Sequence, residues 1–113
     1  MTQTATKRTL DKLRKEQWTV GIVEKWNQFS KTRHDLFGFV DLVAIRDGET
    51  LGIQATSYSN IAARVKKIKE HENYLKVKRA GWNLEVWGWK ATRKVSKTTN
   101  NVYYRHTCRV VSL

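Results

Sequence analysis

The sequence has no proline, a single cysteine and only six glycines among its 113 residues. The lone Cys108 excludes an intrachain disulfide and a zinc site built from several cysteines. Without proline or clustered glycine there is no flexible linker and no low-complexity segment. The apolar runs are short, and Asp41 interrupts the longest, Phe39–Ile45, so we expect no transmembrane span. These absences predict one folded domain over residues 1–113.

Acidic residues are scarce too, since ten Asp and Glu compare with 22 Lys and Arg, giving a formal net charge of +12. Such a charge on a small protein is typical of one that binds a polyanion: DNA, RNA or an anionic membrane surface. Membrane binding requires an amphipathic helix with bulky apolar anchors, which Ile61–Arg79 lacks. Residues 1–7 contain no apolar stretch typical of a signal peptide, so we expect a cytoplasmic protein.

The apolar patterning alternates between the periods of helices and strands. Polar, basic loops are expected over Asn27–Arg33 and Ala91–Asn101. The order predicts a single α/β domain, with an αβββαβ core, a mixed sheet flanked by helices, and a further C-terminal strand. The expected helices are Lys7–Gln17 and Ile61–Gly81, and the expected strands are Val20–Trp26, Asp35–Ile45, Thr50–Thr56, Leu84–Trp89 and Val102–Val111.

Asp47-Gly48 between two apolar runs is a strong signal for a tight β-hairpin. A two-residue turn there places Asp41 opposite Gln54, and both then project from the face that also carries Thr56. A carboxylate in the middle of an apolar strand is costly without a partner or a metal ion. Glu24, among the apolar residues of the preceding strand, has the same peculiarity.

Two carboxylates and an amide oxygen directed at one point would suit Mg²⁺ or Mn²⁺. The alternative is structural. Asp41 would then lie near an edge or bond to a loop, and Glu24 would pair with Lys25 or Arg33. Asp35 is expected to support the site or to cap the chain turn before its strand.

The segments Phe-Gly-Phe-Val-Asp41-Leu-Val-Ala and Leu-Gly-Ile-Gln54-Ala55-Thr56, with Glu24 before them, resemble the PD-(D/E)XK nuclease superfamily. The likeness is greatest to small phage and archaeal Holliday-junction-resolvase-like members. It implies that Glu24, Asp41, Gln54 and the Ala55 carbonyl hold the metal ion. Thr56 stands where the superfamily has its catalytic lysine. Either Lys66 or Lys67 of the following helix would take that role, with Lys67 as the first candidate, or the protein binds nucleic acid without cutting it well.

Basic residues on either side of the hairpin are expected to follow the phosphates of a nucleic acid. Ser57 and Asn60 are expected to cap the second helix or to contact a phosphate beside it. The predicted nucleic-acid-binding residues are Lys31, Arg33, Ser57, Asn60, Arg64, Lys66 and Lys67.

The resemblance implies a Mg²⁺-dependent endonuclease that hydrolyses DNA, with branched DNA as a candidate substrate and the host cytoplasm as its place if a phage encodes it. The alternative is a nuclease-fold protein impaired in cleavage that binds DNA or RNA, which the residues Gln54 and Thr56 favour. A basic scaffold subunit of a larger assembly is a third possibility. By analogy with resolvases we expect a homodimer, formed through the last strand or through Trp87 and Trp89. These two tryptophans otherwise pack under a helix.

Overall fold

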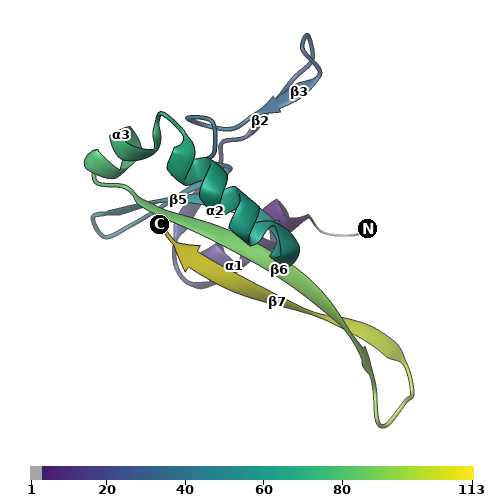
Figure 1. Ribbon diagram of the computed structural model, residues 1–113. Helices are drawn as coiled ribbons and strands as arrows, with labels where there is room; N and C mark the ends of the chain where they lie inside the picture. The colour runs from purple at the N-terminus through teal and green to yellow at the C-terminus, as the bar shows by residue number, and fades with distance from the viewer. Residues whose placement is uncertain (1–3) are drawn as a thin grey trace.

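A five-stranded mixed sheet forms the centre of the computed structural model, which describes residues 4–113 (Figure 1). The molecule is a single α/β domain, as the sequence predicts, and it ends in a long C-terminal strand. Only β5 and β6 are parallel, and the other neighbouring strands are antiparallel. In sheet order the strands are β1 (Thr19–Ile22), β4 (Leu42–Arg46), β5 (Glu49–Ser57), β6 (Asn83–Val95) and β7 (Val102–Ser112).

The hairpin between β4 and β5 has the predicted register. Arg46 lies opposite Glu49, and Leu42 lies opposite Ile53. Asp47 and Gly48 form the turn with positive φ angles of 40° and 80°. Positive φ at both turn positions matches the right-handed twist of the flanking strands, which is why Asp-Gly predicts this turn.

Helices cover both faces of the sheet. Helix α1 (Ala5–Lys15) buries Leu10 and Leu13 against one face, and Thr4 caps the helix by accepting a hydrogen bond from the Lys7 amide. Trp87 is buried in this layer, and the Trp89 indole N–H donates to Thr9 Oγ1 of α1 at 2.8 Å. Both tryptophans therefore pack under a helix.

The opposite face is covered by α2 (Ile61–Glu70) and α3 (Tyr74–Arg79), which bury Ile61, Ile68 and Val77. The prediction of one helix over Ile61–Gly81 is wrong, because the chain is extended at His71. The His71 ring accepts a hydrogen bond from the Asn73 amide, and such a local side-chain contact competes with the helix.

Three predicted strands have different limits in the structure. Val20–Trp26 is interrupted because the amides of Val23 and Glu24 both donate to the Asp41 carbonyl. The segment expected to be the loop Asn27–Arg33 contributes instead to a hairpin, in which β2 (Lys25–Asn27) pairs with β3 (Thr32–His34).

Asp35–Ile45 is a strand only from Leu42 onward, because Phe37 and Gly38 have positive φ angles that no strand accommodates. β6 continues to Val95, so much of the expected loop Ala91–Asn101 is strand, and Val95 pairs with Val102. None of the helices in residues 4–113 has the length and apolar character that a membrane span requires.

Candidate metal centre

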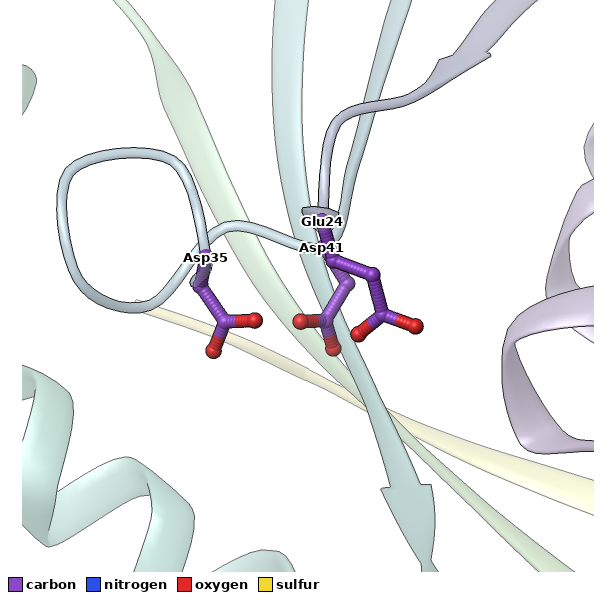
Figure 2. Close-up of side chains that lie close together, drawn as sticks. All are labelled: Glu24, Asp35 and Asp41. Carbon is purple, nitrogen blue, oxygen red and sulfur yellow. The ribbon is translucent and has the colours of Figure 1, made fainter. Parts of the chain in front are cut away.

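Three carboxylates from three separate segments meet beside the start of β4. Oxygen atoms of Glu24, Asp35 and Asp41 all lie within 4.8 Å of one another. Figure 2 shows the three side chains next to one another with their carboxylates pointing the same way. We call these three residues the acidic cluster. It could hold a metal ion, and the expectation that Glu24 and Asp41 lie together is confirmed.

Backbone hydrogen bonds hold Asp41 and Glu24 in place. The Asp41 amide donates to the Ile53 carbonyl at 2.9 Å, and Asp41 Oδ2 accepts from the Ala55 amide at 3.0 Å. Glu24 follows β1, and its amide donates to the Asp41 carbonyl at 3.3 Å. The backbone of Asp41 therefore positions a second carboxylate of the cluster, that of Glu24.

Asp35 enters the cluster because it closes the β2–β3 hairpin. Lys25 lies opposite His34, so the residues just outside this pair, Glu24 and Asp35, are brought together at the base of the hairpin. Asp35 is therefore a member of the cluster itself, whereas its position in the sequence predicts only a supporting or capping role. The sequence does not indicate this hairpin, because the polar, basic residues Asn27–Arg33 predict a loop.

The loop after Asp35 is fixed from the far side by the connection between α2 and α3. Asn73 Nδ2 donates to the Phe37 carbonyl at 3.1 Å, and the His71 ring lies against Phe39 with centroids 5.3 Å apart. A side chain on Gly38 would collide with the same His71 ring. The loop therefore has little freedom to move its carboxylate away from the cluster.

Burial and like charge make the cluster unfavourable for negative charge. Asp41 is only 5% exposed, and its pKa is raised from 3.8 to about 8. Burial is the largest cause, followed by a hydrogen bond with Asp35, while the Ala55 amide acts in the opposite direction. Glu24 is partly compensated, because Arg33 Nη1 lies 3.2 Å from its Oε1. A divalent cation would favour the ionised form of Asp41.

The donors in the cluster are hard oxygen anions, which suit Mg²⁺, Mn²⁺ or Ca²⁺ better than a soft metal ion. Like charges this close are stable together only when they share protons or hold a cation. The residues present therefore fit a divalent metal ion.

The other predicted ligands have different contacts. Gln54 is buried and its Nε2 donates to the Phe39 carbonyl at 3.2 Å, while Oε1 has no hydrogen-bond partner within residues 4–113. Gln54 thus bonds to the segment just before Asp41, and its role as a ligand stays a prediction. The Ala55 amide bonds to Asp41. Because N–H and C=O of one strand residue point to the same edge, the Ala55 carbonyl lies on the edge that faces Asp41.

The predicted lysine substitute and the helix caps are less well supported. Thr56 is buried and lies opposite Gly88 of β6, and Lys67 is exposed on α2. Neither Ser57 nor Asn60 makes a side-chain capping bond, so that expectation is wrong. Their side chains bond to each other instead, with Asn60 Nδ2 donating to Ser57 Oγ at 3.0 Å.

The predicted nucleic-acid-binding residues divide between two elements. Lys31 and Arg33 belong to the exposed β2–β3 hairpin, and Arg33 contacts Glu24. The other three are on α2, where Lys66 and Lys67 are exposed and Arg64 is half-buried.

Comparison of the chain with family models, with curated proteins and with solved structures finds no match. The geometry of the acidic cluster and the charge of the chain are therefore the observations from which a function can be argued.

Proposed function

We propose that the chain is a divalent-metal-dependent endonuclease of the PD-(D/E)XK type that hydrolyses DNA phosphodiesters, including those of branched DNA. The observation that carries the proposal is a cluster of three carboxylates within 4.8 Å of one another, one of them buried and two half-buried, in a chain with a net charge of +12. A basic protein attracts polyphosphates, and a carboxylate cluster can hold the cation that phosphodiester hydrolysis uses.

The order of elements supports the same proposal. Apart from the β2–β3 hairpin and the short helix α3, which are additional, the chain follows the order of the αβββαβ core of that superfamily. The elements of this core are helix α1, the antiparallel strands β1, β4 and β5, helix α2 and the parallel strand β6. Asp41 precedes β4, and the Ala55 backbone approaches it from β5, which is where the resemblance expects these residues.

Glu24, Asp35 and Asp41 would hold Mg²⁺ or Mn²⁺, and the Ala55 carbonyl and Gln54 Oε1 are further candidate donors. The bound cation would supply Lewis-acid activation of water and of the phosphate. The chain's own contribution is to hold the carboxylates rigidly, through the Ala55 amide on Asp41 and the Asp41 carbonyl on the Glu24 amide.

A binder impaired in cleavage is the alternative. Thr56, at the position of the superfamily's lysine, carries no charge and is only 7% exposed, so it cannot stabilise charge on a phosphate. Lys67 is the candidate substitute, and its ammonium would have to approach the cluster when DNA binds.

The proposed homodimer would form through β7. Strand β6 pairs with β5 on one side and β7 on the other, and Trp87 is buried under α1, whereas β7 is an edge strand of the sheet. The part of this edge that lies beside the body of the sheet, residues 108–112, can pair with its equivalent in a second copy. Sedimentation velocity of the purified protein tests this part of the proposal.

Cleavage of a supercoiled plasmid and of a four-way DNA junction in Mg²⁺ or Mn²⁺ tests the activity. We expect the wild type to nick DNA and Asp41→Asn to lose nicking, because the variant removes a cluster charge while keeping an acceptor for the Ala55 amide. Asp47→Asn is the matched control, since Asp47 is an exposed turn carboxylate outside the cluster. It should cleave like the wild type.

The possible failures differ from one another. If the wild type binds Mn²⁺ and DNA but cuts neither substrate, the impaired binder is the correct function. If Asp41→Asn nicks as fast as the wild type, the acidic cluster is not the active site.

A further inference from the structure

The outer part of the β6–β7 hairpin extends beyond the rest of the sheet. β5 pairs with β6 only as far as Trp89, so from Lys90 onward β6 pairs with β7 alone. Figure 1 shows this part as a long two-stranded ribbon, green and yellow, that extends away from the helices. We call residues 90–107 the β6–β7 arm.

The charge of the arm is of one sign. Residues 86–113 contain no Asp or Glu. The arm carries five basic residues, and none of them has an acidic residue next to it in sequence or opposite it across the ribbon. These residues are Lys90, Arg93, Lys94, Lys97 and Arg105.

Both faces of the arm carry a tyrosine beside a basic side chain. Arg93 lies opposite Tyr104 on one face, and Lys94 lies opposite Tyr103 on the other. Tyr103 and Tyr104 are 51% and 59% exposed. A ribbon that docks on another protein or on a membrane would have one apolar face. Here both faces are cationic, which suits a ribbon that lies in a groove between the two phosphate backbones of a duplex.

A two-stranded ribbon standing free in water is only marginally stable, so an element of this length implies a partner that contacts it. The major groove of B-form DNA, about 12 Å wide, admits a two-stranded β-ribbon. The major groove of A-form RNA is too narrow and deep for side chains to enter. The shape therefore favours DNA over RNA.

The arm begins at the end of the sheet that holds the acidic cluster. Ala55, whose amide contacts Asp41, lies opposite Trp87 in the parallel pair, and the arm starts three residues later at Lys90. Neighbouring strands are about 4.8 Å apart. Strand β6 is the next strand after β5, whose Ala55 contacts the cluster. A duplex held by the arm would lie at the same end of the sheet as the carboxylates.

We propose that the β6–β7 arm enters the major groove of a DNA duplex and is the principal duplex-binding element of the chain. The inference rests on the proposed function for its partner, but it concerns binding and needs neither the metal ion nor cleavage.

Fluorescence anisotropy with a labelled 30-base-pair DNA duplex in EDTA tests the proposal on the full chain. The arm variant combines Arg93→Gln, Lys94→Gln and Arg105→Gln. The matched control combines Lys69→Gln, Lys76→Gln and Arg79→Gln, which removes the same charge from exposed positions on α2 and α3. Thermal unfolding and Mn²⁺ binding of both variants establish that the body of the protein is folded.

We expect the arm variant to lose about tenfold or more in DNA affinity, and to lower the slope of log affinity against log salt by up to about 0.9 per lost phosphate contact. The control should change affinity by less than about threefold. The wild type should bind the DNA duplex more tightly than an RNA duplex of the same sequence.

Equal losses in the arm variant and the control would overturn the proposal, as would equal affinity for the two duplexes or tighter binding to phosphatidylserine vesicles than to DNA. A wild type that never cuts DNA, with the arm variant still selectively weak in binding, would refute the nuclease and support the arm. Cleavage by the wild type with equal losses in both variants would do the reverse.

Discussion

The acidic cluster and the β6–β7 arm place opposite charges at one end of the same sheet, and they are built in different ways. Three short segments within residues 24–41 form the cluster, and it is held by backbone contacts such as the Ala55 amide on Asp41. The arm is one hairpin, with exposed charges and regular pairing. Charge in the arm is solvated and costs the fold little, whereas charge on the buried Asp41 of the cluster destabilises the fold. The stability of this protein should therefore respond to cations at the cluster and hardly at all to charge changes in the arm.

The largest expected effect is stabilisation by metal. A ligand at 100 times its Kd that binds only the folded state stabilises it by about 2.7 kcal/mol. We expect Mn²⁺ at that excess to raise the Tm of the wild type by roughly 10 °C, measured by circular dichroism against EDTA. Asp41→Asn should abolish the rise, while the triple arm variant and Asp47→Asn should keep it. A full Mn²⁺ response in Asp41→Asn would remove the contrast between the two regions.

The next effect is a pH dependence that only the cluster should show. The pKa of Asp41 is about 8 in the folded protein against 3.8 for an ordinary Asp, so between these values the folded state holds a proton that the unfolded state has released. Stability contributed by this group is therefore complete below about pH 4, is lost as the pH rises, and changes no further above about pH 8.

Thermal unfolding in EDTA across that range measures the loss. Asp41→Asn should unfold with a weaker pH dependence than the wild type, and it should be the more stable of the two at pH 8. The arm variant should follow the wild-type curve. Identical curves for Asp41→Asn and the wild type would show that Asp41 ionises as it does in water.

The cluster and the arm also differ in what their residues reveal in sequence. Asp41 was identifiable because a carboxylate between Val40 and Leu42 needs a partner, and Asp-Gly fixed the register of its hairpin. Asp35 was not, because its place depends on the pairing of Lys25 with His34, which no apolar alternation indicates. Contacts across a polar hairpin leave little trace in a hydrophobic pattern.

The arm was predicted only in part for a similar reason. Ala91–Asn101 is polar and basic, so its composition is that of a loop, yet β6 continues to Val95. The ladder to β7 sets this limit, with Val95 opposite Val102 and every one of residues 90–95 paired with a residue of β7. Propensity is a weak guide where cross-strand pairing determines the structure.

A third expected effect tests how rigidly the cluster is supported. Gly38 has a φ of 93°, and a Cβ there would meet the His71 ring, so Gly38→Ala strains the loop that follows Asp35. We expect a loss of about 1–3 kcal/mol in unfolding free energy, together with weaker Mn²⁺ binding. Gly21→Ala is the control, because a Cβ there meets nothing within 4 Å. Unchanged Mn²⁺ affinity in a destabilised Gly38→Ala protein would separate the loop from the site.

The smallest expected effect concerns the cation that the protein itself supplies to the cluster. Arg33 pairs with Glu24 at 3.2 Å, but its side chain is 67% exposed, and such pairs contribute less than about 1 kcal/mol. Arg33→Gln should therefore leave the Tm in EDTA nearly unchanged. It should tighten Mn²⁺ binding, measured by isothermal titration calorimetry, because Glu24 then has no competing positive partner on that hairpin strand.

Lys31→Gln provides the comparison for Arg33→Gln, since it removes one positive charge from the same hairpin without touching Glu24. If both variants tighten Mn²⁺ binding equally, the effect comes from the overall charge of the hairpin. If only Arg33→Gln does, the ion pair itself competes with the metal ion. Arg33 would then neutralise Glu24 while the metal site is empty. When the cation binds, Arg33 would be released and could contact a phosphate. A single side chain would thus link metal binding at the acidic cluster to DNA binding at the basic surface.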